Sequence, residues 1–233
     1  MVKSRYQRCR ELRGCLPAEG LLGDDGLSKV SVPKDDGTMR DWYNEGVPTD
    51  AQRLPSCVGR AVAQMLMALF RRNGRRVKID GDAIWRRGRE MFYGGDMSGG
   101  LLLHQGVFAA ESLGLLRKGE YEIFRPANDL AEIDRYLSIS PLVQGTATWP
   151  AWDRPNPVNG QIARGTPNRN AGHATVIFDV QKRNGRYYNI FANSWGRSWG
   201  RHGYGILTEA MYREATLDRP LGLVYHPRYT GMI

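Results

Sequence analysis

The sequence predicts an α+β fold, in which a helical half is followed by a β half and a cleft lies between them. The chain has 233 residues, 41% of them apolar and 24% charged, which is typical of a globular protein that buries a core. Between residues 56 and 140, apolar side chains recur at three- and four-residue spacing, as in amphipathic helices. After residue 141 the period changes, and segments rich in β-branched residues alternate with turn signals.

The helical half is expected to contain four helices. In the first, Val62, Leu66 and Leu69 share one face, and Asn73-Gly74 ends the helix. The expected ranges are 56–72, 82–93, 104–113 and 128–137.

The clearest signal in the β half is Asn184-Gly185, a dipeptide typical of a two-residue hairpin turn. It separates two expected strands, over 173–181 and 186–192. Further strands are expected over 141–148, 203–207 and 221–225, and a long loop over 149–171. We therefore expect residues 1–40 to form an N-terminal extension and 41–233 one domain, with a helical lobe over about 56–140 and a β lobe over about 141–225.

The charge of the chain does not by itself indicate a partner. Lys and Arg number 33 against 24 Asp and Glu, a net charge of +9, but the basic residues are scattered. Solvated surface faces are therefore favoured over a nucleic-acid site. No apolar run reaches the roughly 18 residues that span a bilayer. The first 22 residues hold several arginines and no apolar stretch, so no signal peptide is expected, which leaves a cytoplasmic or virion-associated location.

The three cysteines are Cys9, Cys15 and Cys57, so at least one is unpaired within the chain. No Cys-x2-Cys pair is present and the four histidines are far apart, so neither a metal site nor a cofactor is expected. Cys9 and Cys15 are interpreted as exposed thiols of the extension. Cys57 starts a predicted helix, where the positive end of the dipole favours a thiolate.

Two later segments complete a chemical site. His173 precedes an apolar strand, and Asn193 begins Asn-Ser-Trp-Gly. Taken alone, Cys57 would be an inert buried thiol and His173 a structural histidine. In the order Cys, His, Asn, however, they supply a nucleophile, a base and a side chain that orients the base.

The segment from Asn193 resembles the papain-like cysteine peptidases almost letter for letter, with Asn-Ser-Trp-Gly followed by Trp199-Gly200 and Gly203-Tyr-Gly. His173 lies 173 − 57 = 116 residues after Cys57, and Asn193 lies 193 − 57 = 136 residues after it. The second spacing falls in the family range of about 130–150. Ser-Cys-Val around Cys57 is similar to bacterial and phage-type members without a long propeptide. The resemblance covers roughly residues 40–225.

The resemblance implies a papain-like two-lobed fold and a cysteine endopeptidase that cleaves polypeptides through a covalent acyl-enzyme. Cys57, His173 and Asn193 would be the catalytic residues, and Trp195 would shield the His–Asn pair. Gln52 would donate to the oxyanion, although it lies five residues before Cys57 where the family has six. Because Pro55 favours an extended residue before it, we expect a straightened loop to absorb that missing residue.

Two other interpretations stay open. The fold could serve as a structural or binding component of a larger assembly such as a phage particle, contacted through residues 1–40, with little or no catalysis. A nucleic-acid-binding protein is less favoured, because such proteins cluster their basic residues and this chain scatters them.

Overall fold

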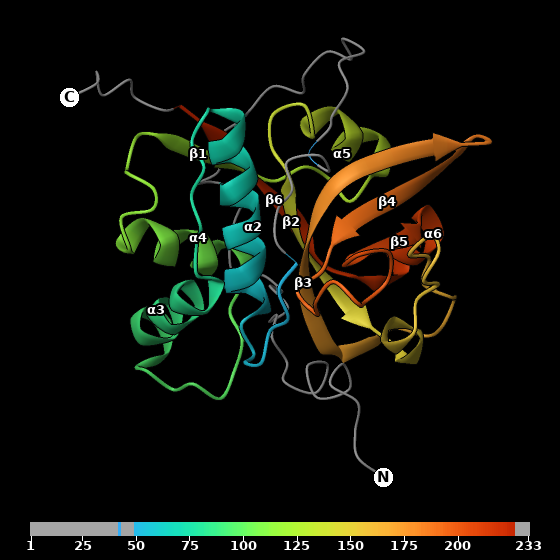
Figure 1. The fold of residues 1–233 in the computed structure, drawn as a ribbon, viewed down its shortest axis with the longest axis horizontal. Helices are drawn as coiled ribbons and strands as arrows, with labels where there is room; N and C mark the ends of the chain where they lie inside the picture. Colours follow the sequence, from blue (N-terminus) through green and yellow to red (C-terminus); the bar gives the residue numbers. More distant parts are fainter. Residues whose placement is uncertain (1–41, 43–48, 227–233) are drawn as a thin grey trace.

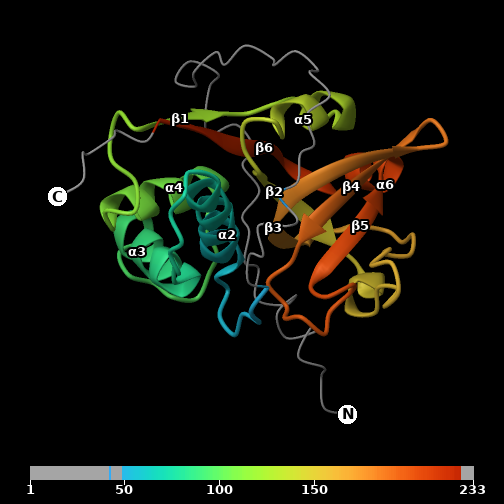
Figure 2. The ribbon, with the colours of Figure 1, turned by 45° about the horizontal axis from the view of Figure 1, so that its top comes forward.

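The computed structural model describes residues 42 and 49–226. Helices α2, α3 and α4 gather on one side, and strands β2 to β5 form the other (Figure 1). In the turned view of Figure 2 the same helices and strands again lie on opposite sides. The α+β, two-lobed prediction is therefore confirmed. The expected extension over 1–40, with Cys9 and Cys15, lies outside the described residues.

Helix α2 (Cys57–Arg72) is the central helix of the helical lobe. Thirteen of its sixteen residues are buried, because α3 and α4 pack against it from one side and β3 from the other. Its last turn carries Arg71 and Arg72, which suits the negative end of the helix dipole. The Arg72 guanidinium also lies 3.2 Å from the centroid of the buried Trp42 ring.

Helices α3 (Gly81–Tyr93) and α4 (Leu103–Ser112) complete this layer. The Asp80 side chain caps α3 by accepting from the Asp82 N–H at 2.8 Å. Helices α2 and α3 approach each other at Gly59, where an added Cβ would lie 2.2 Å from the Gly81 carbonyl oxygen. Only a residue without a side chain fits at this crossing.

The β lobe is built on one antiparallel sheet with the strand order β1-β6-β2-β3-β4-β5. Its strands are β1 (Tyr121–Phe124), β2 (Leu142–Thr148), β3 (Asn168–Arg183), β4 (Arg186–Ala192), β5 (Tyr204–Thr208) and β6 (Thr216–Tyr225). Strand β6 runs between β1 and β2 and so joins the strand that follows the α2–α4 layer to the rest of the sheet (Figures 1 and 2).

Most expected elements are confirmed within a few residues. Asn184 and Gly185 both have positive φ, 49° and 75°, as a tight hairpin turn requires, and β4 has the expected bounds. Strands β3 and β6 each begin five residues earlier than expected. Helix α5 (Leu130–Tyr136) lies within its expected range.

Three short elements were not expected: β1, the 3₁₀ helix η3 (Pro150–Asp153) and helix α6 (Glu209–Ala215). The prediction of one long loop over 149–171 is therefore wrong at both ends, since η3 and the start of β3 fall within it. Among residues 42 and 49–226, no helix combines the length and the apolar character that crossing a bilayer demands.

Candidate active site

Cys57 is the first residue of α2 and is fully buried. Its sulfur accepts a hydrogen bond of 3.2 Å from the main-chain N–H of Ala174, the residue after His173. This contact brings the start of α2 against β3 in the other lobe. The start of the helix and the N–H donor both place positive partial charge at the sulfur.

His173 lies on β3, and its Nε2 atom is 2.7 Å from Oδ1 of Asn193, just beyond the end of β4. The same Oδ1 accepts the Ser194 main-chain N–H at 2.7 Å, which identifies that atom as the amide oxygen. The Nε2 atom of His173 must therefore donate its hydrogen. In the neutral ring this leaves Nδ1 as the proton acceptor.

Burial governs the charge of His173. Removal from water lowers the pKa of His173 to about 4, although the Asn193 hydrogen bond acts in the opposite direction. The ring on its own is thus neutral near pH 7. A positive charge on it requires a negative partner such as a Cys57 thiolate.

Two indole rings contact the imidazole of His173. The Trp195 ring lies with its centroid 4.7 Å away at 34°, and the Trp152 ring lies 6.0 Å away at 90°. All three side chains are buried. The His–Asn hydrogen bond therefore lies in an apolar surrounding.

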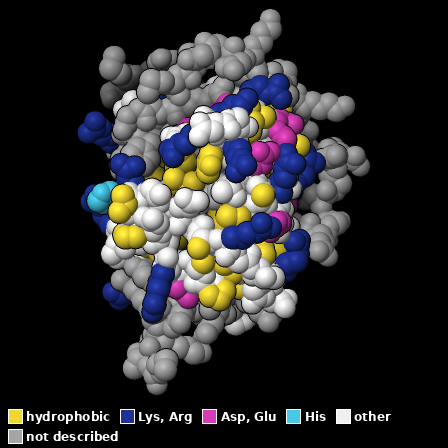
Figure 3. All heavy atoms as spheres, turned by 90° about the vertical axis from the view of Figure 1, so that its right-hand side faces the viewer, with side chains coloured by type: hydrophobic (Ala, Val, Ile, Leu, Met, Phe, Trp, Pro, Cys, Tyr) yellow, Lys and Arg dark blue, Asp and Glu magenta, His cyan; other side chains and the backbone are white. Residues whose placement is uncertain are grey.

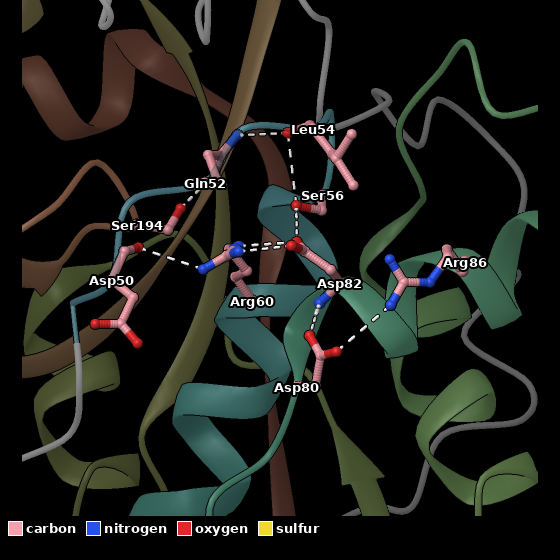
Figure 4. Close-up of polar contacts among 9 residues, drawn as sticks. All are labelled: Asp50, Gln52, Leu54, Ser56, Arg60, Asp80, Asp82, Arg86 and Ser194. Carbon is pink, nitrogen blue, oxygen red and sulfur yellow. Dashed lines mark hydrogen bonds and ion pairs between the residues drawn. The ribbon is translucent and has the colours of Figure 1, made fainter.

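Gln52 is buried on the loop that leads to Cys57. The Ser194 hydroxyl donates to its Oε1, and its main-chain N–H donates to the Ser194 carbonyl at 2.7 Å (Figure 4). With the oxygen held there, the Nε2 group donates to the Leu54 carbonyl at 3.2 Å, further along the same loop. The NH₂ group of the Gln52 amide is therefore directed toward Leu54, three residues before Cys57.

The expectation of a straightened loop is wrong, because the chain bends at Leu54-Pro55. The main-chain bond between Gln52 and Ser194 holds the start of this loop, and the Gln52 side chain bonds the Leu54 carbonyl two residues ahead, at the bend. The loop that leads to Cys57 is thus bent where a straight course was expected.

Ser194 and Trp152 contact the predicted site residues but were not expected from the sequence. Ser194 bonds both Gln52 and Asn193, and its place between Asn193 and Trp195 in the motif was the available signal. Trp152 lies on η3 within the expected loop, where no periodic pattern singles it out. Among the residues that the structure describes, no group of three or more His, Cys, Asp or Glu side chains is placed to hold a metal ion.

The sequence model of the papain family cysteine proteases matches residues 158–218, a segment that contains both His173 and Asn193. The fold is papain-like. It is similar to xylellain, a cysteine protease from Xylella fastidiosa, at 16% identity and a TM-score of 0.64, covering 98% of this chain and all of that one. The resemblance to papain-like peptidases drawn from the motifs is thereby confirmed, and it is consistent with an enzyme.

Two further solved structures have the same architecture. Digestive procathepsin L 3 of Tenebrio molitor is 17% identical with a TM-score of 0.64, covering 94% of this chain and 78% of that one. Bromelain protease of Ananas comosus, in complex with the E64 inhibitor, is 16% identical with a TM-score of 0.58, covering 80% and 97%. No curated protein matches the sequence. The similarity to bacterial and phage-type members stays a prediction.

Proposed function

We propose that the protein is a cysteine endopeptidase in which Cys57 is the nucleophile, His173 the general base and acid, and Asn193 the residue that orients His173. The observation that carries the proposal is the double use of Asn193 Oδ1, which bonds both His173 and the Ser194 N–H. It gives the imidazole one tautomer and leaves Nδ1 to exchange a proton with the thiol.

The first half of the reaction forms the acyl-enzyme. Nδ1 of His173 takes the thiol proton, and the Cys57 sulfur attacks the carbonyl carbon of the peptide bond. The resulting oxyanion is stabilised by the Cys57 main-chain N–H and by Nε2 of Gln52. When the C–N bond breaks, Nδ1 returns the proton to the leaving amine and a thioester remains.

The second half hydrolyses the thioester. Nδ1 of His173 takes a proton from water, whose oxygen attacks the thioester carbon through a second oxyanion. The C–S bond then breaks, so the acid product leaves and the sulfur regains the proton. Throughout, Trp195 covers the His–Asn hydrogen bond from water, as its ring contact with His173 supports.

A polypeptide substrate fits this chemistry better than a nucleic acid. On the face shown in Figure 3, Lys and Arg side chains are mixed with Asp and Glu. Arg213 forms ion pairs with both Asp129 and Glu209, and Arg164 with Glu214, so these two arginines have acidic partners. This face therefore lacks the continuous basic stripe that binds a phosphate backbone.

The test is cleavage of a peptide library by the wild-type chain and by Cys57→Ala, with labelling by a thiol-directed epoxide in parallel. We expect cleavage and one label per chain, on Cys57, and neither in Cys57→Ala. Cleavage that survives this substitution would refute the mechanism. A folded wild type that neither cleaves nor takes up the label would refute the function.

A further inference from the structure

A second polar cluster lies between the first turn of α2 and the start of α3 (Figure 4). Arg60, one turn after Cys57, donates from Nε to Oδ1 of Asp82 at 2.9 Å and from Nη2 to Oδ2 at 2.7 Å. The two side chains are only 20% and 19% exposed. This fork geometry fixes both groups much more firmly than a single contact would.

The Arg60–Asp82 pair also holds both ends of the loop 50–56. Asp82 Oδ1 accepts the Ser56 hydroxyl at 2.5 Å, and Arg60 Nη1 donates to the Asp50 carbonyl at 3.4 Å. Gln52 lies between these two attachment points. The pair therefore fixes the loop to the helical lobe, while Ser194 fixes it to the β lobe.

Ser56 occupies the N-cap position of α2 without acting as a cap. A serine there usually accepts from the second or third N–H of the helix, but no such side-chain bond forms. The hydroxyl is directed to Asp82 instead. The Ser56 side chain thus does not compete for the N–H groups at the start of α2, where the sulfur and the oxyanion carry negative charge.

The negative charge of Asp82 would disfavour a thiolate at the start of α2 if no positive charge balanced it. Burial raises the pKa of Asp82, but hydrogen bonds from Arg60 and Ser56 and the charges of Arg60 and Arg86 outweigh burial, so the net shift is downward. The carboxylate is therefore ionised at neutral pH and is neutralised by Arg60. Besides Arg60 and Asp82, four charged groups lie near the start of α2: Asp50, Lys78, Asp80 and Arg86. On the β3 side the titratable group is His173, the neighbour of the Ala174 N–H that contacts Cys57.

We propose that Arg60 and Asp82 are positioning residues for the peptidase reaction. They hold the loop 50–56 and turn the Ser56 hydroxyl away from α2, while Arg60 cancels the carboxylate charge at the nucleophile's helix end. The proposal rests on the proposed function, but part of its test requires no peptide cleavage.

The first measurement is the rate at which iodoacetamide alkylates Cys57 between pH 5 and 9, read by peptide mapping. In Arg60→Met the uncompensated carboxylate disfavours the thiolate, so we expect the rate at pH 6 to fall about tenfold, as for a one-unit rise in thiol pKa. In Arg60→Met/Asp82→Asn the charge is balanced again, and the rate should return to within about twofold of wild type.

Asp80→Asn is the matched control. It removes a carboxylate from the start of α3, where Asp82 also lies, but Asp80 is exposed and asparagine still caps α3. We expect its alkylation profile to coincide with that of the wild type. Loss of this negative charge would shift the profile toward lower pH if it acted on the thiol. A shift as large as the opposite shift in Arg60→Met would mean that any nearby charge acts, and would overturn the specific role of the pair.

The second measurement separates position from charge. Arg60→Lys keeps the charge but cannot donate as a fork, so its alkylation profile should stay within about twofold of wild type while kcat falls about tenfold with KM little changed. This variant also carries the test if Arg60→Met does not fold. An unchanged kcat in folded Arg60→Lys, or an unchanged alkylation profile in folded Arg60→Met, would overturn the proposal.

The two proposals fail in different ways. If Cys57 alkylates selectively but no peptide is cleaved, the endopeptidase function fails while the effect of Arg60 on the thiol remains measurable. If the wild type cleaves peptides and the Arg60 variants behave like it, the positioning role alone is refuted.

Discussion

Acid should destabilise the protein through His173. The cleanest perturbation is a fall in pH in a Cys57→Ala chain, because the titration of His173 is then not coupled to a thiol. Burial lowers the pKa of His173 to about 4 in the folded protein, against an ordinary value of 6.5. Between these two values the unfolded chain binds a proton that the folded chain does not, so the free energy of unfolding decreases as the pH falls.

The size of the effect follows from the shift in pKa. A shift from 6.5 to about 4 corresponds to about 3 kcal/mol at 1.36 kcal/mol per unit. None of this loss is present well above pH 6.5, and all of it is present below about pH 4. Within the window the free energy of unfolding should fall by about 1.4 kcal/mol for each pH unit.

Urea unfolding followed by tryptophan fluorescence at pH 4.5, 5.5, 6.5 and 7.5 measures this dependence. Cys57→Ala/His173→Gln is the control, since glutamine does not titrate while the carboxylates remain in both proteins. The difference in unfolding free energy between the two proteins should shrink as the pH falls from 6.5 to 4.5. A constant difference would refute the argument that burial keeps His173 neutral, and a growing difference would show a raised pKa.

Three further substitutions test the site and the helix crossing. Asn193→Ala should lower kcat about a hundredfold, because it releases the His173 ring from its productive orientation; wild-type turnover in the folded variant would assign that role elsewhere. Gln52→Ala should lower kcat by about 10²–10³ with KM little changed; a loss of only a few-fold would leave the oxyanion to main-chain donors. Gly59→Ala should lower the free energy of unfolding by about 1–3 kcal/mol, since its Cβ would lie 2.2 Å from the Gly81 carbonyl oxygen. An unchanged melting temperature would contradict the tight crossing of the two helices.

The elements that the sequence predicted best are those specified by neighbouring residues. The Asn184-Gly185 turn and strand β4 depend on backbone conformation and side-chain pattern within about ten residues, and both are found where expected. Strand β1 was missed because its four residues become a strand by pairing with β6, about a hundred positions away in the chain. Helix α6 spans only seven residues, too few for its period to stand out.

The candidate site likewise has residues that could be predicted from the sequence and contacts that could not. Cys57, His173 and Asn193 were predicted from motif and spacing, and the structure brings Asn193 to His173 and the Cys57 sulfur to the Ala174 N–H. The fork between Arg60 and Asp82 was not predictable. In the sequence, Asp82 is indistinguishable from an ordinary acidic residue in the first turn of a helix, and Arg60 is one of many scattered basic residues.

The order in which the sheet is completed affects when the site can form during synthesis. Strand β6 is the last described strand along the chain, yet it inserts between β1 and β2. Until it leaves the ribosome, β2 has one open edge and β1 has no partner in the described sheet. Cys57, His173 and Asn193 are all translated earlier, so the nascent chain carries these three residues before the sheet around His173 has all its strands. Pairing of β6 with β1 and β2 is thus a late step, which follows translation of all three residues.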